Sequence, residues 1–171
     1  MKITILTLFP EMFTSFLENS IIKRAIAKNL VSFELINIRD FTLDKHHRVD
    51  NPPVGGGAGL IMMCQPVLDA LNSVKTESAK VLLTSPRGTT FNQKKALELS
   101  KEDHLIFIAG HYEGIDERVN NYVDELVSLG DFILTGGETA IMVMSDSIIR
   151  LINGVISEDS IKEESFSSNL L

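Results

Sequence analysis

Residues 104–114 have the sequence HLIFIAGHYEG, and residues 126–138 have the sequence LVSLGDFILTGGE. Each stretch is an apolar run followed by a segment punctuated with glycine, which is typical of a buried strand that ends in a loop. Glycines in such loops let backbone amides and carbonyls approach a ligand closely, and open α/β sheets bind ligands at their strand ends. Two such loops close together predict a pocket late in the chain.

Apolar patterns elsewhere in the chain predict the elements around this pocket. We expect further strands at 3–8, 33–38 and 80–85, and we expect Ser85-Pro86-Arg87-Gly88 to end the last of them. The strands alternate with helices, which predicts an α/β fold with a mostly parallel sheet covered by helices on both faces. The helices expected from their apolar spacing cover 10–25, 91–100 and 138–153, the last one ending at Gly154.

The segment 39–59 differs in character from the rest of the chain. It has no periodicity of its own, and loops of this length inside a compact domain are usually functional or disordered. We interpret its glycine-rich end, 55–59, as a hinge or lid, because it lacks the Lys-Ser/Thr pair of a phosphate-binding P-loop. His46 and His47 are adjacent and have no third ligand at suitable spacing, so we interpret them as solvated or substrate-contacting residues and assign no metal ligand.

Composition limits the class of protein. The chain has 171 residues, 44% of them hydrophobic, which is enough for one domain with a substantial core. The net charge of −7 argues against a protein that binds nucleic acid over its whole surface. The single cysteine, Cys64, together with the lack of a signal-peptide pattern or a long apolar run, predicts a cytoplasmic protein with no membrane partner.

Several common catalytic motifs do not occur in the sequence. It has no Gly-x-Ser-x-Gly, Cys-x-x-Cys or His-Glu-x-x-His motif, and no Gly-x-Gly-x-x-Gly follows the first strand. These observations disfavour α/β-hydrolases, zinc sites of the usual spacing, dinucleotide-binding folds and the common methyltransferase fold.

Five motifs together are similar to those of one family. They occur in this order: 8–13 LFPEMF, 39–42 RDFT, 55–59 GGGAG, 110–118 GHYEGIDER and 130–138 GDFILTGGE. The chain resembles the bacterial tRNA (guanine-N1)-methyltransferases of the trefoil-knot (SPOUT) class along its whole length. The resemblance implies a deep C-terminal trefoil knot, which is rare among folds. It also implies methyl transfer from S-adenosylmethionine to N1 of guanosine 37, just 3′ of the tRNA anticodon, by a homodimer whose active site lies between the subunits; DNA is not an expected partner.

The resemblance also implies which residues contact the cofactor. Packing in the core is the alternative for the apolar members of this set, and tight turns are the alternative for Gly110 and Gly130. The expected cofactor-binding residues are Ser85, Pro86, Gly110, Tyr112, Glu113, Gly114, Leu129, Gly130, Asp131, Phe132, Ile133, Leu134, Gly136 and Gly137.

The chemistry requires two further groups. Guanine N1 carries a proton that a general base must remove, and an arginine is suited to the charge that develops on the guanine oxygen of a base drawn out of its stack. By resemblance the arginine is Arg150, for which a solvated helix position is the alternative. Glu164 takes the place of the family's aspartate before Ser-Phe, with Asp159 as the second candidate. The alternative for the acidic segment 158–164 is a solvated terminus.

The resemblance also predicts the domain organisation. Residues 1–156 form the cofactor-binding catalytic domain, and residues 157–171 form a linker. Family members continue into a small helical domain that helps to hold the tRNA, so we expect a truncated chain that binds S-adenosylmethionine and methylates tRNA weakly or not at all. The family is associated with a Mg²⁺ requirement, but the sequence offers no assignable site.

Three alternatives stay open on the sequence alone. The first is another knotted RNA methyltransferase with a different target atom. The second is a non-catalytic module that binds the cofactor or RNA. The third is a doubly wound nucleotide-binding enzyme, which would bind ATP or NAD instead of S-adenosylmethionine.

Overall fold

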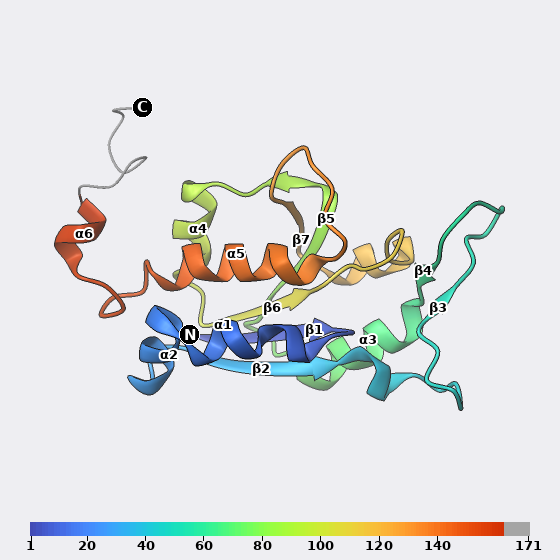
Figure 1. Cartoon of the computed structure of the whole chain (residues 1–171), viewed down its shortest axis with the longest axis horizontal. Helices are drawn as coiled ribbons and strands as arrows, with labels where there is room; N and C mark the ends of the chain where they lie inside the picture. Colours follow the sequence, from blue (N-terminus) through green and yellow to red (C-terminus); the bar gives the residue numbers. More distant parts are fainter. Residues whose placement is uncertain (163–171) are drawn as a thin grey trace.

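The fold is built on one parallel sheet. The computed structural model describes residues 1–162 (Figure 1). Five strands lie in the order β2-β1-β6-β5-β7, and every neighbouring pair is parallel. A separate antiparallel pair, β3 (Asp50–Asn51) and β4 (Ile61–Met62), lies in the long connection. The five main strands are β1 (Lys2–Thr7), β2 (Ser32–Asn37), β5 (Lys80–Thr90), β6 (His104–Ile108) and β7 (Glu125–Ser128).

Helices connect these strands in the order that the sequence predicts. Short 3₁₀ helices η1, η2 and η3 supplement the α-helices and precede or follow strand ends. The helical elements are η1 (Pro10–Phe13), α1 (Thr14–Glu18), α2 (Ser20–Ala27), η2 (Ile38–Phe41), α3 (Cys64–Val74), α4 (Gln93–Leu99), η3 (Glu117–Tyr122), α5 (Gly137–Ile149) and α6 (Glu158–Lys162).

Both faces of the sheet are buried, as expected for parallel strands. Side chains of β6 alternate between the two faces: Leu105 and Phe107 pack in the core that contains residues of α2, α4 and α5, whereas Ile106 and Ile108 pack in the core that contains residues of α3 and η3. All four are fully buried. The expected α/β class with helices on both faces is therefore confirmed.

The expected helix 10–25 is wrong in one respect, because the chain breaks it into three parts. Ser20 has a φ of 52° and α1 ends just before it, at Glu18. A non-glycine residue in this left-handed region cannot continue an α-helix. The apolar spacing passes through the break unchanged, so it conceals the turn.

The expected end of the third strand is also wrong. Thr84 and Thr89 are both opposite Val127 of β7, so residues 85–88 form an excursion from β5 and the strand then resumes. Ser85-Pro86 does interrupt the hydrogen-bonded pairing between β5 and β7, but this pairing resumes at Thr89.

The last long helix is shorter than expected. The helix α5 ends at Ile149, and Arg150 is its C-cap. The next two amides, those of Leu151 and Ile152, bond to carbonyls three residues back, which tightens the chain into 3₁₀-type turns before Gly154. Figure 1 shows α5 running from the loop after β7 toward α6. The deep trefoil knot stays a prediction.

Candidate functional site

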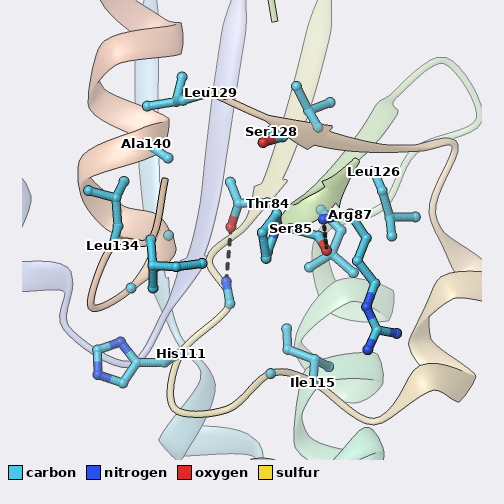
Figure 2. Close-up of a pocket in the computed structure, with 18 of the residues that line it drawn as sticks. Thr84, Ser85, Arg87, His111, Ile115, Leu126, Ser128, Leu129, Leu134 and Ala140 are labelled. Carbon is cyan, nitrogen blue, oxygen red and sulfur yellow. Dashed lines mark hydrogen bonds between the residues drawn. The ribbon is translucent and has the colours of Figure 1, made fainter. Parts of the chain in front are cut away.

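A cavity of about 390 Å³ opens at the carboxyl ends of β5, β6 and β7. Three segments frame it: the excursion of β5, the loop after β6, and the loop from β7 to α5. Figure 2 shows Leu134 and Ala140 on one side, with Leu126, Arg87 and Ile115 on the other. The two glycine-punctuated stretches and the third strand-end loop therefore meet in one place, as the sequence predicts.

Thr84 holds the base of the cavity together. Its hydroxyl donates to the carbonyl of Ile108 at 3.2 Å and accepts from the N–H of Gly110 at 3.1 Å. The N–H of Gly137 in turn donates to the carbonyl of Gly110 at 2.7 Å. The end of β5, the loop after β6 and the start of α5 are thus joined by consecutive hydrogen bonds.

Gly137 is the point of closest approach among these segments. A Cβ atom on this residue would lie 2.1 Å from the Thr84 hydroxyl and 2.9 Å from the backbone nitrogen of Gly110. Any side chain here would collide with backbone, so glycine is required for α5 to start against the loop after β6.

The excursion of β5 forms one wall of the cavity. The N–H of Arg87 donates to the Ser85 hydroxyl at 3.2 Å, which closes a tight turn. The Arg87 guanidinium pairs with Glu117 at 3.1 Å, and both side chains are about four-fifths exposed. A pair with that exposure is weak and can exchange for a ligand or a phosphate.

The loop from β7 to α5 exposes apolar side chains at the opening. Phe132 is 55% exposed, Ile133 is 83% exposed and Leu134 is 40% exposed. The N–H of Gly130 donates to the Ser128 hydroxyl at 3.1 Å, which fixes where the loop leaves β7. An exposed apolar group next to a cavity marks a surface that a ligand or partner covers.

Tyr112 is the strained residue of the loop after β6. It has a φ of 58°, and its hydroxyl accepts a hydrogen bond from Arg39 Nη2 at 3.3 Å. Backbone strain of this kind persists where surrounding contacts impose it, and it clusters at ligand sites. Arg39 brings the start of the long segment 39–59 to the edge of the cavity.

The other end of that long segment is fastened to the same loop. The N–H of Glu113 donates to the Leu60 carbonyl at 3.0 Å, and the N–H of Met62 donates to the Gly114 carbonyl at 2.9 Å. The segment 39–59 is therefore held at the cavity wall by Arg39 at its start and by Leu60 and Met62 just after its end, and its regular parts are the end of η2 and β3.

The Asp116–Arg118 pair, by contrast, has a local role. Asp116 accepts from the Arg118 N–H at 3.0 Å and from its guanidinium at 2.7 Å, and so caps η3. The hydrogen bond from the guanidinium is the main cause that lowers the pKa of Asp116 below its ordinary value. Neither residue lines the cavity.

Thirteen of the fourteen expected cofactor-binding residues line this cavity. Asp131 is the exception, because it is exposed and lies outside the lining set. Whether these residues contact the cofactor stays a prediction. The structure adds lining residues that were not expected from the sequence, and they come from strands, from η3, from α5 and from the loops between them: Ile61, Leu83, Thr84, Arg87, His111, Ile115, Glu117, Asn120, Leu126, Val127, Ser128, Thr135 and Ala140.

Comparison with known proteins identifies the family. The sequence model described as tRNA (Guanine-1)-methyltransferase TrmD matches residues 1–171. The chain belongs to this family.

Named relatives and a solved structure agree with this membership. A tRNA (guanine-N(1)-)-methyltransferase of Malacoplasma penetrans is 54% identical over 171 residues, which are 100% of this chain and 76% of the relative. A protein of the same name from Clostridium botulinum is 59% identical and is covered over 72% of its length, with all of this chain matched. The crystal structure of tRNA (m1G37) methyltransferase from Aquifex aeolicus has a TM-score of 0.86 and 39% identity, covering 92% of this chain and 72% of that one.

Of the two expected catalytic residues, only Arg150 lies within the described residues, and it is not among the residues that line the cavity. Arg150 is half-buried at the end of α5 opposite to Gly137, ten residues after Ala140, the last residue of α5 that lines the cavity. At 1.5 Å per residue this is about 15 Å. Glu164 lies outside the described residues, and Asp159 lies on α6, beyond Arg150 along the chain.

Metal and membrane features can be stated for residues 1–162. In this part of the chain, no group of three or more His, Cys, Asp or Glu side chains is placed to hold a metal ion. None of its helices has the length and apolar character to cross a membrane.

Proposed function

We propose that the chain transfers a methyl group from S-adenosylmethionine to N1 of guanosine 37 in tRNA. The supporting observation is the cavity at the carboxyl ends of β5, β6 and β7, built from the glycine-rich loops of a tRNA (guanine-1)-methyltransferase family member. The named relatives and the Aquifex aeolicus enzyme support the choice of reaction and of nucleotide.

The cavity is suited to S-adenosylmethionine. Its volume of about 390 Å³ is within the usual range of small-molecule sites, about 300–1,000 Å³. Gly110 and Gly136 line the cavity without side chains, which leaves room for the adenine, and Leu134, which is 40% exposed, can cover the ring. When bound, the cofactor supplies a methyl group already activated by its sulfonium.

Arg150 would then act in the site of a second subunit. It lies about 15 Å along α5 from Ala140, the last α5 residue that lines the cavity of its own chain, by the helical rise of 1.5 Å per residue. A homodimer in which α5 of one subunit approaches the cavity of the other would bring the guanidinium to the guanine oxygen, where negative charge develops. This geometry supports a homodimer with its active site between subunits.

The general base is proposed to be Glu164, with Asp159 as the second candidate. A carboxylate on the segment after α5 would share the dimeric arrangement with Arg150 and take the N1 proton. We also propose a cytoplasmic location, where the tRNA substrate is found. A Mg²⁺ requirement is proposed from the family resemblance alone, with no residue assigned to it.

The proposed function is tested by cofactor binding and methyl transfer. Calorimetry with S-adenosylmethionine should show binding, and transfer should occur to unmodified tRNA with guanosine at position 37 but not to the same tRNA with adenosine there. Equal methylation of both tRNAs would instead indicate another knotted RNA methyltransferase. Because this chain alone is expected to methylate weakly or not at all, transfer is measured also with the chain joined to the C-terminal domain of a full-length relative. Binding without transfer to any RNA even then would indicate a non-catalytic module.

Arg150→Ala should separate binding from chemistry. Because Arg150 is remote from the cavity of its own chain, cofactor affinity should stay within about twofold. In a full-length version that carries the C-terminal domain, kcat should fall by about a hundredfold or more, as for the loss of one charge-stabilising donor. Arg24→Ala, on the exposed face of α2, is the control and should leave both unchanged. Loss of cofactor binding in Arg150→Ala would show a structural role instead.

A further inference from the structure

We infer that His111 and Glu138 form a buried positioning pair that holds the loop after β6 against the start of α5 and thereby sets the affinity of the cavity for S-adenosylmethionine. This inference rests on the proposed function for its ligand. The pair itself rests on the contacts of Thr7, Phe9 and Gly136 with these two side chains.

Glu138 is a carboxylate in an unusual place. It is 1% exposed and is the second residue of α5. The Thr7 hydroxyl donates to Glu138 Oε1 at 2.7 Å. Because the Thr7 hydroxyl also accepts from the Phe9 N–H at 2.9 Å, its one proton is committed to Glu138. The end of β1 is thus tied to the first turn of α5.

The second carboxylate oxygen faces His111. Glu138 Oε2 lies 3.5 Å from His111 Nδ1, and within the described residues 1–162 neither atom has a hydrogen-bond partner. A buried carboxylate that is only half satisfied is costly, and two facing lone pairs would add repulsion. A proton on His111 Nδ1 can be donated to Glu138 Oε2, which satisfies the carboxylate oxygen and removes the repulsion. We therefore assign a proton to Nδ1 of His111.

The ring of His111 is held in this orientation from three sides. Its centroid lies 4.9 Å from that of Phe9 and 5.0 Å from that of Tyr112, which it meets edge to face. A Cβ atom on Gly136 would lie 2.4 Å from His111 Nδ1 and 2.5 Å from Glu138 Oε2. The pair therefore packs directly on the backbone of Gly136, and Figure 2 shows the ring turned away from Ser85 and Arg87.

This packing joins the pair to the cavity through the backbone. His111 and Gly136 form an antiparallel bridge between the two loops, and both residues line the cavity. His111 also precedes Tyr112, the residue with the left-handed backbone. The pair acts on the ligand through the positions of these backbone groups, so His111 and Glu138 are positioning residues.

Two threonines on β1 provide a matched test. Thr4 and Thr7 lie three residues apart on β1, and both are fully buried. The Thr7 hydroxyl bonds to Glu138 of the pair, whereas the Thr4 hydroxyl bonds to His104 at 2.9 Å. Thr7→Val should raise the Kd for S-adenosylmethionine about tenfold, a change of roughly 1.4 kcal/mol. Thr4→Val should lower the unfolding temperature but keep the Kd within twofold. Equal Kd values in the two variants would overturn the inference.

The proton on His111 is tested directly in the wild-type protein. Long-range ¹H–¹⁵N correlation spectra should show Nδ1 protonated in the wild-type protein; the chain has four histidines, and loss of one pattern in His111→Asn assigns the signal. Glu138→Gln should move the ring toward the Nε2–H tautomer and raise the Kd, with a smaller effect on kcat at saturating cofactor. An unprotonated Nδ1 in the wild type would overturn the pair.

The two proposals fail in different ways. If the wild-type chain binds no S-adenosylmethionine, the proposed function fails, whereas the tautomer of His111 still decides whether the pair exists. If the wild type binds the cofactor and Thr7→Val and Glu138→Gln both bind it equally well, only the positioning role fails.

Discussion

At the scale of single residues, the candidate site depends as much on glycines, which have no side chain, as on residues that place a side chain in it. The sequence predicts the glycines of the loops because they interrupt apolar runs, and it predicts thirteen residues that line the cavity. It cannot predict Thr84, because a threonine at the end of a strand has the same local pattern whether or not its hydroxyl bonds to Gly110. The His111–Glu138 contact joins residues from two loops and has no periodic signature either.

Gly137→Ala should destabilise the protein and weaken cofactor binding. The added methyl would lie 2.1 Å from the Thr84 hydroxyl and 3.0 Å from the Ala109 Cα atom, so α5 must move away from the loop after β6. Overpacking of this kind costs about 1–3 kcal/mol of unfolding free energy. Denaturant unfolding and calorimetry with S-adenosylmethionine measure the two effects.

Gly110→Ala is the matched comparison for this prediction. Its methyl would meet the Thr84 carbonyl oxygen at 3.1 Å, which a shift of a few tenths of an ångström relieves. The expected order of stability is wild type, then Gly110→Ala, then Gly137→Ala. If the two variants were equally stable, the close approach at Gly137 would not be the controlling contact.

At the scale of elements, the order of strands and helices follows from apolar spacing, because each strand is a short apolar or alternating run and each helix has one apolar face. Element boundaries are less predictable. The break between α1 and α2 comes from the extended backbone of Asn19 and the left-handed backbone of Ser20, and the resumption of β5 at Thr89 comes from pairing with Val127 of another strand. Apolar spacing reports neither the backbone torsions nor the partner strand.

His104 makes the contact between β6 and its neighbours dependent on pH. The side chain is 5% exposed, with Nε2 2.9 Å from the Thr4 hydroxyl and Nδ1 3.2 Å from the Thr76 hydroxyl. Burial, reinforced by the charge of Lys2, lowers the pKa of His104 below its ordinary value of 6.5, although Glu34 opposes this effect. Above pH 6.5 the imidazole is neutral in both the folded and unfolded states. As the pH falls below 6.5, His104 is protonated in the unfolded state before it is protonated in the folded state. The unfolding free energy should therefore fall between pH 6.5 and the lowered pKa of the folded state.

Denaturant midpoints at pH 7.5 and pH 5.5 measure this dependence. His104→Gln, which keeps a donor and an acceptor but cannot titrate, should lose less stability over this interval than the wild type. His46→Gln, at an exposed position in the long segment, should behave as the wild type does. The same slope in all three proteins would show that His104 does not contribute.

At the scale of the whole molecule, one cavity depends on four parts of the chain that are far apart in sequence. The ends of β1, β5 and β6 meet at the start of α5 through Thr7, Thr84 and Gly110, and β7 joins them by its pairing with β5. Binding at such a place stabilises the entire fold instead of one segment, because all four parts must be folded for the cavity to exist.

S-adenosylmethionine should therefore raise the unfolding temperature of the whole chain. At a concentration one hundred times the Kd, the expected stabilisation is about 2.7 kcal/mol. For a domain of this size that corresponds to roughly 5–10 °C. Differential scanning calorimetry checks the shift, with ATP as the control ligand. A shift with ATP or NAD and none with S-adenosylmethionine would indicate a doubly wound nucleotide-binding enzyme.

The place of β1 in the sheet has a consequence for biosynthesis. One neighbour, β2, follows soon after it, but the other, β6, begins only at His104, which pairs with Lys2. The ribosome adds about 5–20 residues per second, so roughly 5–20 seconds pass between the synthesis of β1 and the synthesis of β6. One edge of β1 is unpaired during this interval. An apolar strand with an open edge invites association with other nascent chains, so slow or stalled synthesis before residue 104 should increase aggregation and the demand for chaperones.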